Sequence, residues 1–149
     1  MGNAMFYHLT RSPAERLLPA LISRARGQGW RIELRGSDAA RMQALDAQLW
    51  VGDGFVPHGL AGGPHDARQP VLLTVAGQAA GNGANCLMTL DGADVSADEM
   101  PALHRACIIF DGGHTPAVNR ARDQWRALTT AGIAAEYWSE ESGRWERKR

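Results

Sequence analysis

The sequence predicts an α/β domain with a mostly parallel sheet and helices on both of its faces. Short apolar segments of strand length alternate with segments whose apolar residues recur at helical spacing, an order typical of α/β proteins. One strand-like segment, residues 106–110, is apolar throughout, as expected for a strand at the centre of a covered parallel sheet. The length of 149 residues is usual for one domain. We therefore expect residues 1–149 to form a single domain.

The predicted strands are short apolar or alternating segments bounded by Gly, Pro or polar residues. They are residues 4–9, 30–34, 71–75, 86–90, 106–110 and 133–138.

The first predicted helix follows the first strand directly. Ser12 is expected to cap its backbone N–H groups, Pro13 suits its first position, and Glu15 stands three residues after Ser12. Pro19 lies inside this helix and must remove one of its hydrogen bonds. Gly27 is expected to end it.

Two longer helices and a shorter one complete the alternation. Ser37 and Asp38 are expected to cap a helix that runs to Trp50. Residues 96–103 hold one or two helical turns. The last helix begins at residues 115–116 with a Thr cap, runs to about residue 130 and stops at Gly132.

Three segments are expected to lack regular structure. Residues 51–70 form a long connection with several Pro and Gly clusters, and such connections are often functional or mobile. Residues 77–85, rich in Gly, Ala and Asn, are predicted as a flexible, hairpin-like turn. The basic residues 147–149 are expected to be a frayed tail.

Composition excludes several classes of protein. Lys plus Arg and Asp plus Glu are both 16, and this zero net charge argues against tight direct binding of DNA. We find no apolar run of membrane-spanning length and no signal peptide, so we expect a cytoplasmic protein. Cys86 and Cys107 lie in apolar strand-like runs, which favours two buried thiols over a disulfide or redox pair.

No catalytic or metal-binding motif emerges from the sequence. The Gly-rich residues 77–83 lead into a strand, whereas a phosphate site needs a helix behind it. Residues 111–115 do connect a strand to a helix, so a degenerate nucleotide-using enzyme remains the alternative hypothesis, although this turn has no Lys and carries Asp111. The histidines, cysteines and serines match no metal or nucleophile motif. We expect no cofactor, no metal and no intrinsic catalysis.

The last helix carries the most informative surface. Arg122 and Arg126 are four residues apart and therefore neighbours on one face, and Trp125 flanks that face. Two guanidinium groups beside an aromatic ring can receive a carboxylate and an apolar group together. The alternative is a solvated face on which Asp123 pairs with Arg126 or Arg120.

A second candidate surface lies at the start of the long connection. Trp50 and Phe55 bracket a Gly-rich stretch, and aromatic residues in such exposed connections often mark an interface. The alternative is that both rings cover the edge of the core.

Three stretches resemble the chi family of DNA polymerase III subunits. They are FYHL at residues 6–9, LDAQLW followed by FVPHGLAG at residues 45–50 and 55–62, and ARDQWR at residues 121–126. The resemblance covers nearly the whole chain in order, and the central block is the most specific part.

The resemblance implies a Rossmann-like fold without a functional nucleotide site. It also implies a non-catalytic subunit that links the clamp loader of the DNA polymerase III holoenzyme to single-stranded DNA-binding protein (SSB) during replication. Members of the family bind the acidic, Phe-ending C-terminal tail of SSB. In many bacteria they also bind the clamp-loader subunit psi.

The resemblance also assigns residues to the two expected interfaces. Arg122 matches the key tail-binding arginine, and Trp125 and Arg126 match the aromatic and basic positions after it. Val118 stands where the best-known members carry a basic residue, and Arg120 is expected to compensate in part.

The psi-facing surface is implied at the start of the long connection. Phe55 matches the aromatic residue used there, with Trp50 and Val56 beside it.

Overall fold

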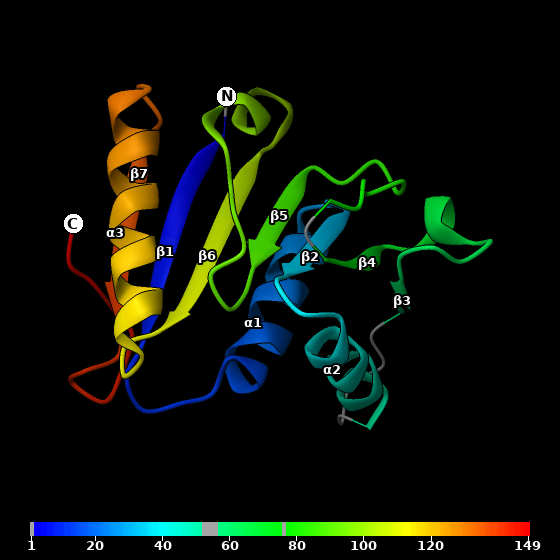
Figure 1. The fold of residues 1–149 in the computed structure, drawn as a ribbon, viewed down its shortest axis with the longest axis horizontal. Coiled ribbons are helices and arrows are strands. Elements are labelled where there is room, and N and C mark those ends of the chain that lie inside the picture. Colours follow the sequence, from blue (N-terminus) through cyan, green and yellow to red (C-terminus); the bar gives the residue numbers. More distant parts are fainter. Residues whose placement is uncertain (1, 52–56, 76) are drawn as a thin grey trace.

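The computed structural model describes residues 2–51, 57–75 and 77–149. These residues form three layers, with helices on both faces of one mixed sheet (Figure 1). The strands are β1 (Asn3–Leu9), β2 (Ile32–Gly36), β3 (Gly59–Leu60), β4 (Val71–Val75), β5 (Cys86–Thr89), β6 (Arg105–Asp111), β7 (Ala135–Ser139) and β8 (Glu146–Arg147). The helices are α1 (Ala14–Gly27), α2 (Ala39–Val51) and α3 (Thr115–Thr130), with short 3₁₀ segments η1 (Asp66–Arg68) and η2 (Ala97–Ala102).

The sheet has the strand order β3-β4-β2-β5-β6-β1-β7-β8. Its neighbouring strands are parallel except for β7 and β8, which are antiparallel. Each predicted strand is present, and β6 lies inside the sheet between β5 and β1. The predicted α/β class with a mostly parallel sheet is therefore confirmed.

Alternation of side chains along the strands creates two hydrophobic cores. On one face, Tyr7, Met88 and Ile109 pack beneath α1 and α2. On the other, Phe6 and Ile108 pack beneath α3 and η2. Figure 1 shows α3 in front of the sheet and α1 behind it. Because both faces are covered, β6 is apolar on both sides over residues 106–110, whereas β2 carries the ion pair of Glu33 and Arg35 on one side.

The helix boundaries follow the sequence except for two predicted caps. Asp38 caps α2 as expected, since its Oδ2 accepts a hydrogen bond from the N–H of Arg41 at 3.3 Å. The caps predicted at Ser12 and Thr115 are wrong, because α1 and α3 have Pro13 and His114 at their N-caps with no side-chain cap. Gly132 has a φ of 85° and ends α3, as predicted.

The segment 77–85 is a crossover and not the predicted hairpin. Strands β4 and β5 both flank β2 and both run parallel to it, so the chain must return along the sheet between them. Asn82 fixes this return, because its buried Nδ2 donates to the carbonyls of Ile32 and Gln69, both at 3.0 Å. Local sequence pattern carries no information about which strands become neighbours.

The described part of the long connection, residues 57–70, contains regular structure. The short strand β3 pairs with β4, and the N–H of Ala61 donates to Leu73 at 2.8 Å. The Asp66 carboxylate then accepts the N–H groups of Gly62 and Gly63, at 2.8 and 3.0 Å.

The C-terminal residues are paired, which corrects the prediction of a frayed tail. Strand β8 pairs with β7, and the N–H of Lys148 donates to the carbonyl of Tyr137 at 2.6 Å. The Tyr137 N–H donates to Arg149 in turn. This pairing satisfies backbone groups that would otherwise be open along the edge of β7.

A further prediction concerns the thiols of the two cysteines. Cys86 and Cys107 are both buried and free, as predicted. Among the described residues, no helix combines the length and apolar character needed to cross a membrane.

Candidate functional site

A groove of about 470 Å³ lies between α3 and the strands at the β7 end of the sheet. We call it the α3 groove and define it by its lining residues, which are His8, Phe110, Val118, Ala121, Arg122, Trp125, Arg126, Tyr137, Lys148 and Arg149. They come from β1, β6, α3 and β7 and from the segment at β8. The groove therefore exists only when both ends of the chain are folded against α3.

The floor of the α3 groove is aromatic. The Trp125 ring packs edge-on against Phe6 at a centroid distance of 5.2 Å and lies 6.1 Å from the Tyr137 ring. The His8 ring contacts Phe110, and its Nδ1 lies 2.5 Å from the hydroxyl of Tyr137. These contacts hold the rings in one arrangement, so the floor can receive an apolar group without reorganising.

The titratable groups of the floor are uncharged at neutral pH. Burial lowers the pKa of His8; carboxylates of Glu141 and Asp111 oppose this shift, and the Arg122 guanidinium adds to it. Burial raises the pKa of Tyr137, although nearby guanidinium groups act against it. The floor therefore adds hydrophobic contact without adding charge.

The rim of the groove is positive. Arg122 is exposed and makes no hydrogen bond or ion pair with any described residue. Arg126 has only a long contact of 3.8 Å with the exposed Asp123, and the Arg149 guanidinium lies 6.0 Å from the Trp125 ring. No Asp or Glu is among the described residues that line the groove.

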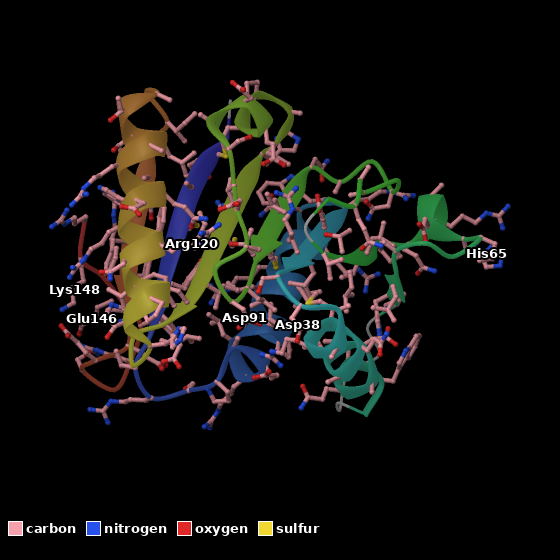
Figure 2. The ribbon with its side chains drawn as sticks, viewed as in Figure 1. Asp38, His65, Asp91, Arg120, Glu146 and Lys148 are labelled. Atoms are coloured by element: carbon pink, nitrogen blue, oxygen red, sulfur yellow. The ribbon has the colours of Figure 1, made fainter. Side chains whose placement is uncertain are left out.

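The structure brings most of the predicted tail-binding residues together. Val118, Arg122, Trp125 and Arg126 all line the α3 groove. Arg120 does not line the groove. It lies two residues before Arg122, and this spacing places the two side chains on different sides of α3. The Nε of Arg120 donates to the carbonyl of Gly92 at 2.5 Å, and its guanidinium pairs with Asp94. In Figure 2, Arg120 and Lys148 lie on opposite sides of α3.

Sequence reasoning missed six residues of the groove, which are His8, Phe110, Ala121, Tyr137, Lys148 and Arg149. His8 and Tyr137 belong to different strands, and only the parallel pairing of β1 and β7 places them side by side. Lys148 and Arg149 have a basic sequence signal, but their terminal position indicated a frayed end. The Lys148 ammonium lies 3.2 Å from Glu141 and 3.7 Å from Glu146.

The second predicted surface is only partly described. Trp50 lies in the last turn of α2 with 52% of its surface exposed, and its ring lies 4.2 Å from the ring of His58. About half of the Trp50 surface is therefore exposed, while its ring packs against the buried His58. Phe55 and Val56 lie outside the described residues.

The turn proposed for a nucleotide is occupied by its own hydrogen bonds. The Gly113 N–H donates to Asp111 Oδ1 at 2.8 Å, and the Gly112 N–H donates to Leu9 at 2.7 Å. His114 N–H bonds back to the carbonyl of Asp111. A phosphate would find none of these three N–H groups free.

The crevice where α/β folds bind nucleotides is also filled. Helices α1 and α3 leave the adjacent strands β1 and β6 toward opposite faces, which defines a switch point. There the buried Glu140 places Oε1 against the backbone N–H groups of Thr10, Arg11 and Ser12, at 3.1, 2.7 and 2.6 Å. The anion that this crevice could bind is therefore already present as a side chain.

Among the described residues, no group of three or more His, Cys, Asp or Glu is placed to hold a metal.

Comparison with known protein families gives a match over most of the chain. A family model described as DNA polymerase III chi subunit, HolC, matches residues 1–136. No curated protein matches the chain. Strand β8, Lys148 and Arg149 lie beyond the matched residues.

Proposed function

Because the chain belongs to the family of DNA polymerase III chi subunits, we propose that it is a non-catalytic accessory subunit linking the clamp loader to SSB. The α3 groove binds the acidic C-terminal tail of SSB during DNA replication. Family membership supports a role within DNA polymerase III, and the α3 groove supports the tail as the ligand.

The observation that carries this proposal is Arg122 at the rim of an aromatic groove. A guanidinium without a protein partner can make two parallel hydrogen bonds to a carboxylate, and such charge-assisted pairs are strong. The terminal carboxylate of the tail binds Arg122, and its Phe ring packs on the floor at Trp125 and Tyr137. The acidic side chains face Arg126, Lys148 and Arg149.

The basic residue expected at position 118 is replaced by the segment after β7. Val118 adds an apolar wall to the groove, whereas Arg149 brings positive charge to it beside Lys148, which is paired with Glu141 and Glu146. We therefore expect micromolar affinity, which corresponds to about −8 kcal/mol.

The test is calorimetric titration of the protein with a synthetic SSB tail peptide at low salt. Arg122→Ala is expected to lose about 1.5–3 kcal/mol, because a charge-assisted contact disappears. Arg122→Lys is expected to recover only part of this, since an ammonium cannot make the bidentate pair.

Arg120→Ala is the matched control, because it removes the same charge from the same helix outside the groove. Its affinity should equal that of the unmodified protein. The proposal fails if the tail peptide does not bind at low salt, or if Arg120→Ala weakens binding as much as Arg122→Ala.

We also propose that Trp50, with Phe55 and Val56, forms the contact with psi or another clamp-loader partner. The exposed indole at the end of α2 supports this. Trp50→Ala is expected to lose a clamp-loader protein that co-purifies with the unmodified chain and to keep tail binding. Retention of that protein by Trp50→Ala contradicts this role.

A further inference from the structure

A second groove, of about 540 Å³, lies on the opposite face of the sheet, alongside α1. We call it the α1 groove and define it by its lining residues, which are Met5, Tyr7, Ser12, Arg16, Leu17, Ala20, Leu21, Arg24, Ala25, Trp30, Cys86, Met88, Arg105, Cys107, Trp138 and Trp145. Helix α1 packs on β2 and β6, so the surfaces of β1 and β7 on this face lie beside it. The groove shares no lining residue with the α3 groove.

The α1 groove collects indole rings. Three of the five Trp residues of the chain line it, and all three are half-buried. Trp30 stacks on His104 with centroids 5.4 Å apart and an interplanar angle of 9°, and the Arg105 guanidinium lies 5.3 Å from the Trp30 ring. Trp145 meets the Tyr7 ring edge-on at 5.5 Å. Of these rings, Trp30 lies just before β2 and Trp145 just before β8 in the chain.

The same groove carries positive charge without a matching negative one. Arg16, Arg24 and Arg105 line it, and no lining residue is Asp or Glu. Within the described part of the chain, Arg16 and Arg24 make no ion pair. The nearby Glu136 accepts a hydrogen bond from the Trp138 indole and has only a long contact of 3.8 Å with Arg147, so its carboxylate offsets part of the charge of the three lining guanidinium groups.

The positive groups are spaced along the groove. Arg16 and Arg24 are eight residues apart on α1, which places them about 12 Å apart along its axis. Arg105 lies at the start of β6, near Trp30. Cations are thus spaced along a surface that also offers aromatic rings.

This combination selects a ligand class. Alternating phosphates and flat bases match spaced guanidinium groups and aromatic faces, whereas a peptide of acidic residues alone would contact the cations and make no use of the indole rings. We propose that the α1 groove binds a short stretch of single-stranded nucleic acid. The binding is weak and salt-dependent, because the chain as a whole has no net charge and only a few phosphates are contacted.

The experiment follows the fluorescence anisotropy of a labelled oligo-dT of about ten nucleotides at low salt, using the full chain. Binding with a Kd below about 1 mM is expected, and Arg24→Gln should weaken it roughly five- to tenfold. Trp145→Phe is expected to weaken it less than Trp145→Ala, because the ring is a stacking surface. An oligo-rU of equal length shows whether the groove prefers DNA or RNA.

Arg26→Gln is the matched control, because Arg26 is exposed on the same helix and does not line the groove. Equal weakening by Arg26→Gln and Arg24→Gln would indicate diffuse electrostatics and overturn the proposal. So would the absence of binding at low salt, equal binding of a poly-Glu peptide, or loss of oligonucleotide binding in Arg122→Ala. Tail binding measured on the same variants keeps this result separate from the role of the α3 groove.

Discussion

At the level of single residues, the floor of the α3 groove depends on the absence of a side chain at Gly112. A Cβ at this position would lie 1.9 Å from His8 Nε2 and 2.8 Å from the carbonyl oxygen of Leu9. The His8 ring has little freedom to move, since it is held by Phe110 and Tyr137. Gly112 thus fixes the position of His8, which lines the groove, although Gly112 itself does not line it.

Gly112→Ala is therefore expected to displace His8, to destabilise the protein by about 1–3 kcal/mol and to weaken tail binding. Urea unfolding and calorimetry measure the two effects. Gly113→Ala is the control, because a Cβ there meets only the Asp111 carboxylate, at 3.3 Å. Equal stability of the two variants would contradict the role of Gly112.

The sequence identified some groove residues and missed others for a physical reason. Arg122, Trp125 and Arg126 lie on one helix, where the helical repeat alone predicts that they are neighbours. His8 and Tyr137 are brought together by pairing between strands, which no local pattern encodes. Predicting them would have required the strand order.

At the level of elements, Glu140 joins the β1–α1 loop to the hairpin of β7 and β8. Its Oε1 accepts the N–H groups of Thr10, Arg11 and Ser12, and the hairpin presents Lys148 to the α3 groove. Burial alone would raise the pKa of Glu140, but these backbone hydrogen bonds lower it below its ordinary value. The ionised carboxylate therefore stabilises the folded state.

The sign of the pH effect follows from this lowered pKa. Between the folded and unfolded pKa values, the unfolded chain binds more protons, so stability falls as the pH falls. Glu140 contributes fully above its unfolded pKa of about 4.3 and loses its contribution as the pH drops through the folded value. We expect Glu140→Gln to reduce stability by about 1.5–3 kcal/mol at neutral pH and to show a smaller loss in acid.

Urea unfolding of both proteins from pH 7 to about pH 3 measures this difference. Glu141→Gln serves as the control, because its carboxylate is exposed and its contact with Lys148 is a surface ion pair of small energy. If Glu140→Gln keeps the acid sensitivity of the unmodified protein, another carboxylate is responsible.

Helices and strands could be predicted where a local sequence pattern specifies them. Apolar runs and helical repeats predicted the strands β1, β2, β4, β5, β6 and β7 and the three α-helices. Strands β3 and β8 are two residues long. They form by pairing with the edges of β4 and β7, respectively. The crossover at residues 77–85 similarly depends on strand order.

At the level of the whole molecule, charge is balanced in total but separated in space. The chain has no net charge, yet among the described residues both grooves are lined by cations and by no carboxylate. Local fields of this kind steer charged partners even when the total charge is zero. The zero net charge therefore lowers the non-specific affinity for DNA, while the two grooves can still bind anionic ligands.

Tail binding is accordingly expected to weaken as salt rises, because exposed charges are screened over about 10 Å at 0.1 M ionic strength. Titrations of the tail peptide across a salt series measure the slope. A peptide with its acids replaced by amides should bind more weakly and show a smaller slope. An affinity that does not change with salt would mean that the aromatic floor alone holds the tail.

Strand β1 lies inside the sheet, and both of its neighbours come late in the chain. Asn3 faces Arg105 in β6, and Ala4 faces Ala135 in β7. A ribosome adds roughly 5–20 residues per second, so β1 waits about 5–20 seconds after its synthesis before β6 exists. During that time its apolar side chains and both of its edges are open to other chains. A strand that has a neighbour on each edge in the finished protein is thus without either of them while most of the chain is being made.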